Sequence, residues 1–253
     1  MRLRDKVAIV TGASKGIGRA IALAFAREGA DLVLAARTKD LLEEVAGQVR
    51  ALGRRAVVAV TDVTEEDQVR AMVDQAVQSF GHINVLVNNA GAGMIKPIWA
   101  TSLNTWEWLM GVNLRGPFLC TKHVWKVMQG NGGGSIINIG STFGSRAHPL
   151  HAAYSASKWG LVGLTKACAQ EGRADNIRVN IINPGKVRTA QRAAIMDKDP
   201  ILEADDIVGA AIFLASDEAH GIQGQVIEME HPLDGAVIRR RRERAQADQT
   251  TGD

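Results

Sequence analysis

The chain has 253 residues, of which 46% are hydrophobic and 23% are charged, a composition typical of a globular domain with its own core. Its two cysteines, Cys120 and Cys168, are too few for a disulfide framework, and no segment approaches the roughly 18 uninterrupted apolar residues of a membrane span. Secreted, disulfide-stapled and membrane-spanning proteins are therefore excluded, and we expect a cytoplasmic protein.

Most of the formal net charge of +3 lies at the carboxyl-terminal end of the chain. Residues 238–253 contain five arginines and three acidic residues, so they carry +2 and leave +1 for residues 1–237. An arginine run followed by small polar residues is typical of a disordered, solvated tail. We predict a single domain over residues 1–237 and a basic tail over residues 238–253. Because no aromatic residues are interleaved with the arginines, we expect neither a nucleic-acid nor a membrane partner.

Short apolar segments alternate with longer amphipathic segments along the predicted domain. The short segments, predicted to be strands, are Val7–Val10, Leu32–Ala35, Ala56–Val60, Ile83–Val87, Ser135–Ile139, Val179–Ile182 and Gln225–Met229. The longer segments, predicted to be helices, are Ile17–Arg27, Leu41–Leu52, Glu65–Phe80, Thr105–Met128, Ala153–Gln170 and Asp205–Ala215. Repeated β-α-β units form a parallel sheet that helices cover on both faces. The sequence thus predicts an α/β fold, a Rossmann-type doubly wound sheet of about seven parallel strands.

Residues at the helix ends agree with these boundaries. Thr64 followed by Asp67 is typical of a capping sequence at the start of the third helix. Gly29 and Gly53 follow the first and second helices, where a residue in the left-handed conformation commonly ends a helix.

A glycine-rich turn joins the first predicted strand to the first helix, and it reads Thr11-Gly12-Ala13-Ser14-Lys15-Gly16-Ile17-Gly18. Glycines allow a tight turn and a close approach to a pyrophosphate, and the start of a helix offers free N–H groups to an anion. The spacing differs from G-x-G-x-x-G, and a purely structural turn is the alternative. The place of the turn after the first strand of a β-α-β unit favours dinucleotide binding.

The end of the second strand indicates which dinucleotide binds. An acidic residue there binds the adenosine ribose hydroxyls, whereas a cation receives a 2′-phosphate. Arg37 stands at this point and Lys15 lies in the glycine turn, so the pair favours NADP(H). Two solvated surface cations are the alternative. Asp62, after the third strand, either accepts the adenine amino group or caps the next helix.

Tyr154 is the one tyrosine of the chain, and Lys158 follows it by four residues, which places both on one face of a helix. A phenol with a pKa near 10 needs a shift of about three units, or roughly 4 kcal/mol, to act at neutral pH. An ammonium group about 4 Å away contributes that order of energy at an effective dielectric near 20. Tyr154 is therefore a candidate acid–base, and Lys158 is the candidate group that activates it.

Ser141 follows the predicted strand Ser135–Ile139, at the edge of the sheet where ligands bind in open α/β folds. Its hydroxyl is suited to donate a hydrogen bond to a substrate oxygen that gains charge. Thr142 is the alternative hydroxyl, and a serine that only forms a turn is the structural alternative.

A series of motifs follows one another along the chain: Thr11-Gly12-x3-Gly16-x-Gly18, Asn88-Asn89-Ala90-Gly91, Asn113, Ser141, Tyr154-x3-Lys158 and Pro184-Gly185 with Thr189. In their order and spacing, these motifs resemble the short-chain dehydrogenase/reductase family over residues 5–230, and its 3-oxoacyl reductase-like branch in particular. The resemblance implies hydride transfer at a nicotinamide, with Tyr154 as the acid–base and Ser141 orienting the substrate. Lys158 would also bind the nicotinamide ribose, and Asn113 would hold a water that links Lys158 to solvent.

The resemblance also implies a cofactor site built from several segments, and no metal. The expected cofactor-binding residues are Gly12, Ser14, Lys15, Gly16, Ile17, Gly18, Arg37, Asp62, Val63, Asn89, Ala90, Gly91, Tyr154, Lys158, Pro184, Gly185, Val187 and Thr189. Lys15 and Arg37 match the basic positions of family members that prefer NADP(H) over NAD(H).

Two departures from the family pattern concern the substrate and the assembly. A short segment, residues 190–200, separates Thr189 from the next helical region, which implies a small or open substrate site. After the last strand the chain reads His231-Pro232-Leu233-Asp234-Gly235 instead of Asp-Gly-Gly. That segment commonly helps to build the family's tetramer, so we expect a homo-oligomer that is either a tetramer or a dimer.

The substrate class rests on weaker signals. Residues 129–134 and Asp175-Asn176 carry no cation that an acidic acyl carrier protein could dock on, so we expect a small carbonyl or alcohol compound. Reduction of a 3-oxoacyl thioester is the alternative. Trp99 and Trp159 either shape an apolar substrate pocket or serve packing alone. A cofactor-bound sensor or scaffold is the alternative from another class, and the complete set of acid–base residues disfavours it.

Overall fold

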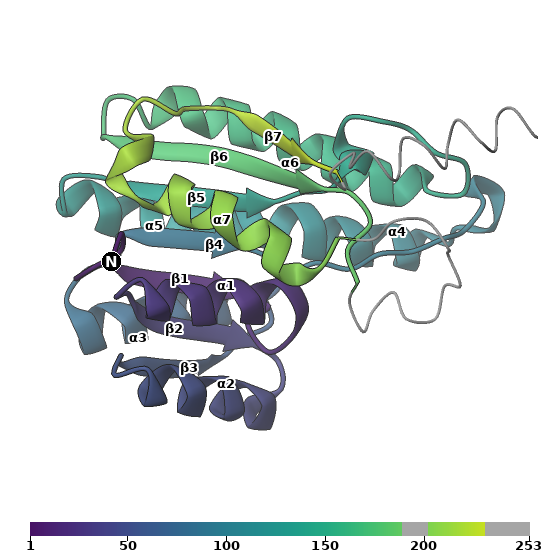
Figure 1. Ribbon diagram of the computed structural model, residues 1–253. Helices are drawn as coiled ribbons and strands as arrows, with labels where there is room; N and C mark the ends of the chain where they lie inside the picture. Colours follow the sequence, from purple (N-terminus) through teal and green to yellow (C-terminus); the bar gives the residue numbers. More distant parts are fainter. Residues whose placement is uncertain (189–201, 231–253) are drawn as a thin grey trace, which may run out of the picture.

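The computed structural model describes residues 1–188 and 202–230. Seven parallel strands form one sheet in the order β3-β2-β1-β4-β5-β6-β7 (Figure 1), which confirms the predicted doubly wound α/β fold. The strands are β1 Val7–Thr11, β2 Asp31–Ala36, β3 Ala56–Val60, β4 Val85–Asn88, β5 Gly134–Ile139, β6 Ile177–Pro184 and β7 Val226–Met229. The strand order reverses between β1 and β4, so the carboxyl ends of these neighbours open the crevice where such sheets bind ligands.

Helices cover both faces of the sheet. One face carries α1 Gly16–Arg27, α2 Lys39–Ala51 and α7 Ala204–Ala215, and the other carries α3 Glu66–Phe80, α5 Gly116–Gly130 and α6 Ala152–Glu171. Alternate residues of a strand enter the two cores: Ala8 and Val10 of β1 face one, and Ile9 faces the other. Burial on both faces explains the uninterrupted apolar runs. In the described part of the chain, every helix is too short or too polar to span a bilayer.

The single helix predicted over residues 105–128 is wrong, because the structure interrupts it. A π-helical turn, Gly111–Arg115, separates α4 Leu103–Met110 from α5. Pro117 has no N–H group to donate to the carbonyl four residues back, so regular α-helical bonding cannot continue through this point. The turn carries Asn113 into the interior, where the residue is 1% exposed.

The start of α3 also differs from the prediction. Glu65 is the capping position of this helix and no side chain caps it. The hydroxyl and N–H of Thr64 instead donate to Oδ1 of Asp62, at 2.8 and 3.0 Å. Asp62 therefore stabilises the turn ahead of the helix rather than the helix itself. Gly29 and Gly53 do follow their helices with positive φ, at 96° and 76°, as predicted.

A buried carboxylate joins the amino-terminal end of β2 to the segment that leads into β3. Asp31 is 5% exposed, accepts hydrogen bonds from N and Nε of Arg55 at 3.0 and 2.7 Å, and lies 2.8 Å from Nη2 of Arg54. Burial raises the pKa of this carboxyl, but the Arg55 hydrogen bonds and the two guanidinium charges outweigh burial and lower it. Ionised Asp31 therefore stabilises the folded state.

Replacing Asp31 should remove this stabilisation. Asp31→Asn should lower the free energy of unfolding at pH 7 by about 2 kcal/mol, below the usual cost of breaking a buried pair because Arg55 is largely exposed. Since the folded-state pKa is lowered, the contribution is present above the unfolded-state pKa near 4 and is lost as the pH falls through the folded-state pKa. Urea unfolding at pH 7 and pH 3 measures both. An equal difference at the two pH values would contradict this account.

Candidate active site

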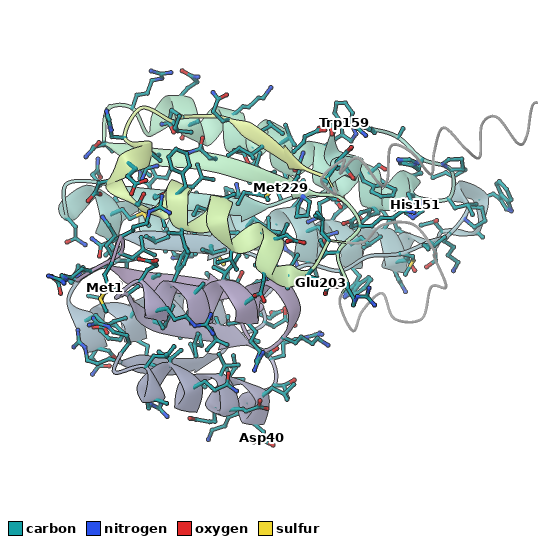
Figure 2. The ribbon with its side chains drawn as sticks, viewed as in Figure 1. Met1, Asp40, His151, Trp159, Glu203 and Met229 are labelled. Atoms are coloured by element: carbon teal, nitrogen blue, oxygen red, sulfur yellow. The ribbon has the colours of Figure 1, made fainter. Side chains whose placement is uncertain are left out.

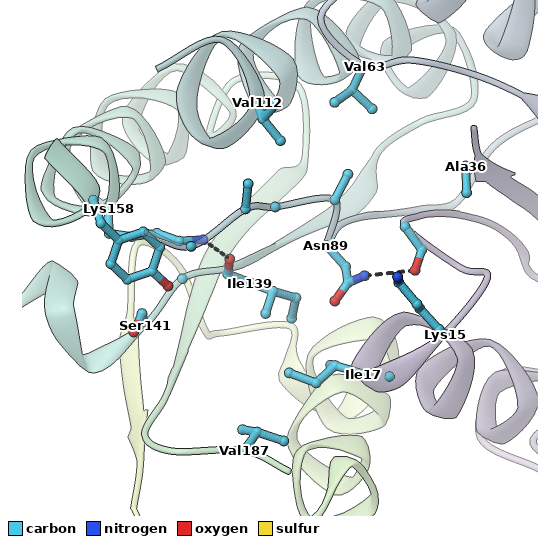
Figure 3. Close-up of a pocket in the computed structure, with 18 of the residues that line it drawn as sticks. Lys15, Ile17, Ala36, Val63, Asn89, Val112, Ile139, Ser141, Lys158 and Val187 are labelled. Carbon is cyan, nitrogen blue, oxygen red and sulfur yellow. Dashed lines mark hydrogen bonds between the residues drawn. The ribbon is translucent and has the colours of Figure 1, made fainter. Parts of the chain in front are cut away.

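A cavity of about 650 Å³ runs along the carboxyl ends of the central strands. Figure 3 shows Lys15 and Ala36 at one end and Ser141 and Lys158 at the other. Most of the predicted site residues line it: Gly12, Ser14, Lys15, Gly16, Ile17, Arg37, Asp62, Val63, Asn89, Ala90, Gly91, Ser141, Tyr154, Lys158, Pro184, Gly185 and Val187. Gly18 and Asn113 lie behind its wall, in contact with lining residues. Thr189 lies outside the described residues.

The glycine-rich turn owes its shape to two close approaches. Gly12 has a φ of 65°, and a Cβ there would lie 2.7 Å from Nδ2 of Asn89. A Cβ on Gly18 would overlap the carbonyl oxygen of Gly12. Side chains at either position would push the turn away from β4, so the residue type is dictated by the space available.

Asn89 joins this turn to the segment that follows β4. Its Nδ2 donates to the carbonyl oxygens of Thr11 and Gly12, at 2.9 and 3.2 Å, and Figure 3 draws one of these bonds. The hydroxyl oxygen of Thr11 accepts the N–H groups of Asn89 and Ala90, both at 3.0 Å. The sequence predicted Asn89 only as a cofactor contact. In the structure its side chain also links the segment after β4 to the turn after β1.

The start of α1 faces this crevice with its N–H groups available. Lys15 is the capping residue, its side chain makes no capping bond, and the first turn of the helix has no acidic residue. The first-turn N–H groups and the positive end of the helix dipole are therefore free to bind an anion. Together with the glycine backbone, which no Cβ shields, this arrangement fits the pyrophosphate of a dinucleotide.

Two exposed cations, Lys15 of the glycine-rich turn and Arg37 after β2, line this end of the cavity. The Arg37 side chain is 74% exposed and its Nη1 lies 4.0 Å from Oδ2 of Asp62. At this distance the ion pair is weak and leaves the guanidinium free to turn toward a phosphate. Ala36, where an acid would bind ribose hydroxyls, contributes no polar side-chain atom. This end of the cavity therefore offers two cationic side chains and no carboxylate at position 36.

The opposite end of the cavity holds the predicted catalytic residues. Ser141 precedes a short 3₁₀ turn, Thr142–Gly144, and its Oγ accepts the N–H of Phe143 at 3.3 Å. Tyr154 lies on α6, and the edge of its ring meets Phe143 at a centroid distance of 5.6 Å. The Nζ of Lys158 is 5.9 Å from the Tyr154 ring centroid. The structure therefore brings the three side chains together at one end of the cavity, as predicted.

Lys158 is a buried cation. It is 5% exposed, and its Nζ donates to the carbonyl oxygen of Ile139 at 3.0 Å (Figure 3). No carboxylate pairs with it in residues 1–188 and 202–230. Burial disfavours the charged form and lowers the pKa of Lys158 to about 8.

Asn113 hydrogen-bonds the π-helical turn to the segment after β4 and to α6, behind the site. Its Oδ1 accepts the N–H of Ala92 at 2.8 Å, and its Nδ2 donates to the Ala92 carbonyl at 2.9 Å and to Oγ of Ser157 at 3.0 Å. The side chain is thereby committed to holding the segment after β4 against α6. Its Oδ1 accepts one N–H and has a second acceptor position, so the role of Asn113 toward a water linked to Lys158 stays a prediction.

Sequence reasoning missed the wall beside Tyr154. Met94, Ile95, Trp108, Val112, Phe143 and His151 line this part of the cavity. The ring of Phe143 packs against those of His148 and His151, at centroid distances of 4.7 and 4.5 Å. Nδ1 of His151 is 2.7 Å from the Pro149 carbonyl, which can only accept, so Nδ1 carries the hydrogen. The sequence did offer one signal for His151, because this residue precedes Tyr154 by only three positions and comes directly before α6.

Two expectations about the substrate side are wrong. Trp99 and Trp159 are 85% and 52% exposed, do not line the cavity and are not packed in a core; Figure 2 shows Trp159 at the edge of the molecule. Residues 129–134 and Asp175-Asn176 precede β5 and β6, so they lie at the amino-terminal edge of the sheet, opposite the cavity. The absence of cations there therefore says nothing about docking of a carrier protein.

No group of three His, Cys, Asp or Glu side chains in the described residues could hold a metal ion. Cys120 and Cys168 are both free thiols. Cys120 lies in the core on α5, where burial raises its pKa to about 12, so it is an unreactive packing residue.

Comparison with known proteins agrees with this geometry. Residues 6–200 match the family described as short chain dehydrogenase. The chain is 35% identical to a 3-oxoacyl-[acyl-carrier-protein] reductase of Thermotoga maritima, covering 94% of this chain and 100% of that protein. It is similar to a short-chain type dehydrogenase/reductase from Mycobacterium marinum, with 33% identity, a TM-score of 0.86 and coverage of 93% and 96% of the two chains. The carveol dehydrogenase from Mycobacterium avium in complex with NAD has 30% identity, a TM-score of 0.86 and coverage of 90% and 97%.

The burial of Lys158 predicts a pH-dependent stability in the cofactor-free protein. Between pH 8 and 10 the unfolded chain holds a proton at this lysine that the folded chain has lost, so its contribution to the free energy of unfolding rises with pH. Lys158→Met should therefore stabilise the protein by about 2–3 kcal/mol more at pH 7 than at pH 10, at about 1.4 kcal/mol per pKa unit. Lys166→Met, at an exposed position of the same helix, is the control and should show no such difference. Chemical denaturation at both pH values would contradict the account if the two variants behaved alike.

Proposed function

The chain belongs to the short-chain dehydrogenase/reductase family, and we propose that it is an NADP(H)-dependent oxidoreductase that interconverts a ketone or aldehyde and the corresponding alcohol. One observation carries the proposal: Ser141, Tyr154 and Lys158 line the same cavity as the glycine-rich turn and its two cations. A dinucleotide laid along the cavity would reach from Arg37 to the catalytic end. The catalytic domain would comprise residues 1–237, with residues 238–253 as a tail that takes no part in the chemistry.

The cofactor supplies or accepts the hydride when it is bound, and the protein handles the proton. Tyr154 is the proposed acid–base: its hydroxyl gives a proton to the carbonyl oxygen during reduction and takes one from the alcohol during oxidation. The Lys158 ammonium favours the ionised phenol. In the structure this ammonium is bound to the Ile139 carbonyl, which keeps it desolvated and beside the ring.

Ser141 is proposed to orient the substrate oxygen. A hydroxyl has one hydrogen to donate and two acceptor positions. The Phe143 N–H donates to Oγ and so occupies one acceptor position. The hydroxyl hydrogen of Ser141 is not used in this contact and can be donated to the substrate. A donor aimed at an oxygen that gains charge stabilises the transition state more than the ground state. Asn113 is proposed to support this end of the site by holding α6 against the segment after β4.

Lys15 and Arg37 support a preference for NADP(H). Each can make a charged hydrogen bond to the 2′-phosphate, worth about 1.5–3 kcal/mol when shielded from water. Both are exposed, so solvent screening reduces that figure. Asp62 is the proposed partner of the adenine amino group through Oδ2, since Oδ1 is bound to Thr64.

The apolar wall of Met94, Ile95, Trp108 and Phe143 supports a small, largely apolar ketone or secondary alcohol as substrate. A second candidate is a 3-oxoacyl thioester, favoured by 35% identity to the reductase of Thermotoga maritima that acts on 3-oxoacyl groups of the acyl carrier protein. Both share one reaction, so the catalytic assignments hold for either.

The proposal includes a cytoplasmic homo-oligomer. Apolar side chains stay exposed along α5 and α6, with Phe118 at 46% and Trp159 at 52%. A shallow hollow lined by Met110, Leu114, Phe118 and Leu164 lies between these helices and the π-helical turn. Apolar surface of this kind supports burial against a second copy of the chain.

Turnover is the direct test of the proposed reaction. Oxidation of NADPH should be seen with at least one member of a panel of simple ketones, β-ketoacyl thioesters and sugars. Tyr154→Phe should lower kcat by at least 10²–10⁴-fold, because it removes the proton donor, while the Kd for NADPH stays within about threefold. A Tyr154→Phe protein with normal turnover would exclude this mechanism. A parent protein that binds NADPH but turns over no member of the panel would favour the sensor or scaffold alternative.

Cofactor preference tests the two cations. Fluorescence titration should show NADPH binding about 10-fold to 100-fold more tightly than NADH, a range that allows for solvent screening. The double change Lys15→Ala, Arg37→Ala should remove most of this preference with little effect on NADH. Ala36→Asp should invert it by repelling the phosphate and binding the ribose hydroxyls. Arg50→Ala, an exposed arginine of α2 outside the cavity, is the control. Equal affinity of the parent for both cofactors would show that the cations are ordinary surface charges.

A further inference from the structure

Asn183 is a buried residue near the end of β6 whose side chain reaches the catalytic turn. It is 0% exposed, and its Oδ1 accepts the backbone N–H of Ser141 at 3.2 Å. From this contact we propose that Asn183 is a positioning residue, which acts on the reaction by setting the place of Ser141. The inference rests on the proposed function of Ser141 as the donor to the substrate oxygen.

The contact lies where backbone pairing between β5 and β6 stops. The last paired residues are Ile139 and Ile182, and the N–H of Gly140 donates to the Ile182 carbonyl at 2.7 Å. One residue further, the side chain of Asn183 takes the next N–H, that of Ser141. An amide side chain therefore replaces the backbone acceptor as the chain leaves the strand and enters the 3₁₀ turn.

Gly140 makes room for this amide. A Cβ at position 140 would overlap Oδ1 of Asn183, so a larger residue there would displace the oxygen that holds Ser141. The Asn183 side chain therefore occupies space that only a glycine at position 140 leaves open. The sequence predicted no role for either residue.

Ser141 is held from two sides as a result. Asn183 fixes its backbone through the N–H, and the Phe143 N–H fixes its Oγ at 3.3 Å. With both contacts made, the backbone of Ser141 is extended, at φ −169° and ψ 156°. The position of the side chain that carries the hydroxyl is thereby fixed. Small misplacements of a reacting group cost large factors in rate, so loss of one contact should be visible in turnover.

A second observation separates Asn183 from an ordinary structural asparagine. Its Nδ2 is buried and makes no hydrogen bond within the described residues, so the bond to Ser141 is what the amide contributes there. Asn180, three residues earlier on β6, uses both ends of its amide, accepting from the Gln225 N–H and donating to the Ile222 carbonyl, each at 2.9 Å. Neither Asn180 nor these two partners line the cavity. Asn180 is therefore a matched control for loss of a buried amide on the same strand.

A double-mutant cycle tests whether Asn183 acts through Ser141. Ser141→Ala, Asn183→Leu and the double variant are compared with the parent, using NADPH and the panel ketone or thioester that the parent reduces fastest. Ser141→Ala should lower kcat by about 10²–10³-fold, and Asn183→Leu by about 10-fold to 100-fold. In the Ser141→Ala background, Asn183→Leu should lower kcat by less than about threefold, because the group it positions is already absent. The Kd for NADPH should stay within about threefold throughout.

The Asn180→Leu control separates an effect on stability from an effect on kcat. Asn180→Leu should lower the free energy of unfolding but leave kcat per folded molecule unchanged. If Asn183→Leu does not fold, the smaller change Asn183→Ala is used in the same cycle.

Full additivity of the two changes, or unchanged kcat in Asn183→Leu, would overturn the positioning role while leaving the proposed function intact. Unchanged kcat in Ser141→Ala, or no turnover by the parent, would overturn the proposed function itself.

Discussion

The Nζ of Lys158 lies in the interior of the site, 3.0 Å from the Ile139 carbonyl and with a pKa lowered to about 8 by burial. Much of the surrounding structure follows from keeping this group there. An ammonium that water and carboxylates do not stabilise acts strongly on a nearby phenol, because little screening intervenes. The same burial should make the contribution of Lys158 to the stability of the cofactor-free protein less favourable at neutral pH than at higher pH. The fold thus accepts a stability cost at the position where the proposed chemistry needs a desolvated charge.

Amide side chains brace the turns around this charge at the edge where the strands end. Asn89 connects the turn after β1 to the segment after β4, Asn113 connects that segment to α6, and Asn183 holds the turn after β5. At each place backbone ladders can no longer pair the N–H and C=O groups, so a side chain has to do so. An asparagine offers a donor and an acceptor on a short stem. The resulting rigidity is what positions a hydroxyl, a phenol and an ammonium within one cavity.

The two ends of the cavity follow different physical rules. At the end near Lys15 and Arg37, exposed cations act through screened charge, so the proposed cofactor preference should depend on salt and change with a few substitutions. At the end near Ser141 and Tyr154, burial strengthens each contact and small displacements matter. Changes of cofactor preference and changes of turnover should therefore be separable in this protein.

The sequence by itself determined the features that depend on local spacing. Alternating apolar runs and amphipathic segments were enough for a parallel, doubly wound sheet, and the four-position spacing of Tyr154 and Lys158 was enough for a shared helix face. Contacts between distant segments were decided by the tertiary structure alone. Asn183 meets Ser141 across 42 positions of the chain, and no local pattern marks such a pair. Trp159 is one residue from Lys158, yet it lies outside the site, because the packing of α6 decides which of its sides faces the sheet.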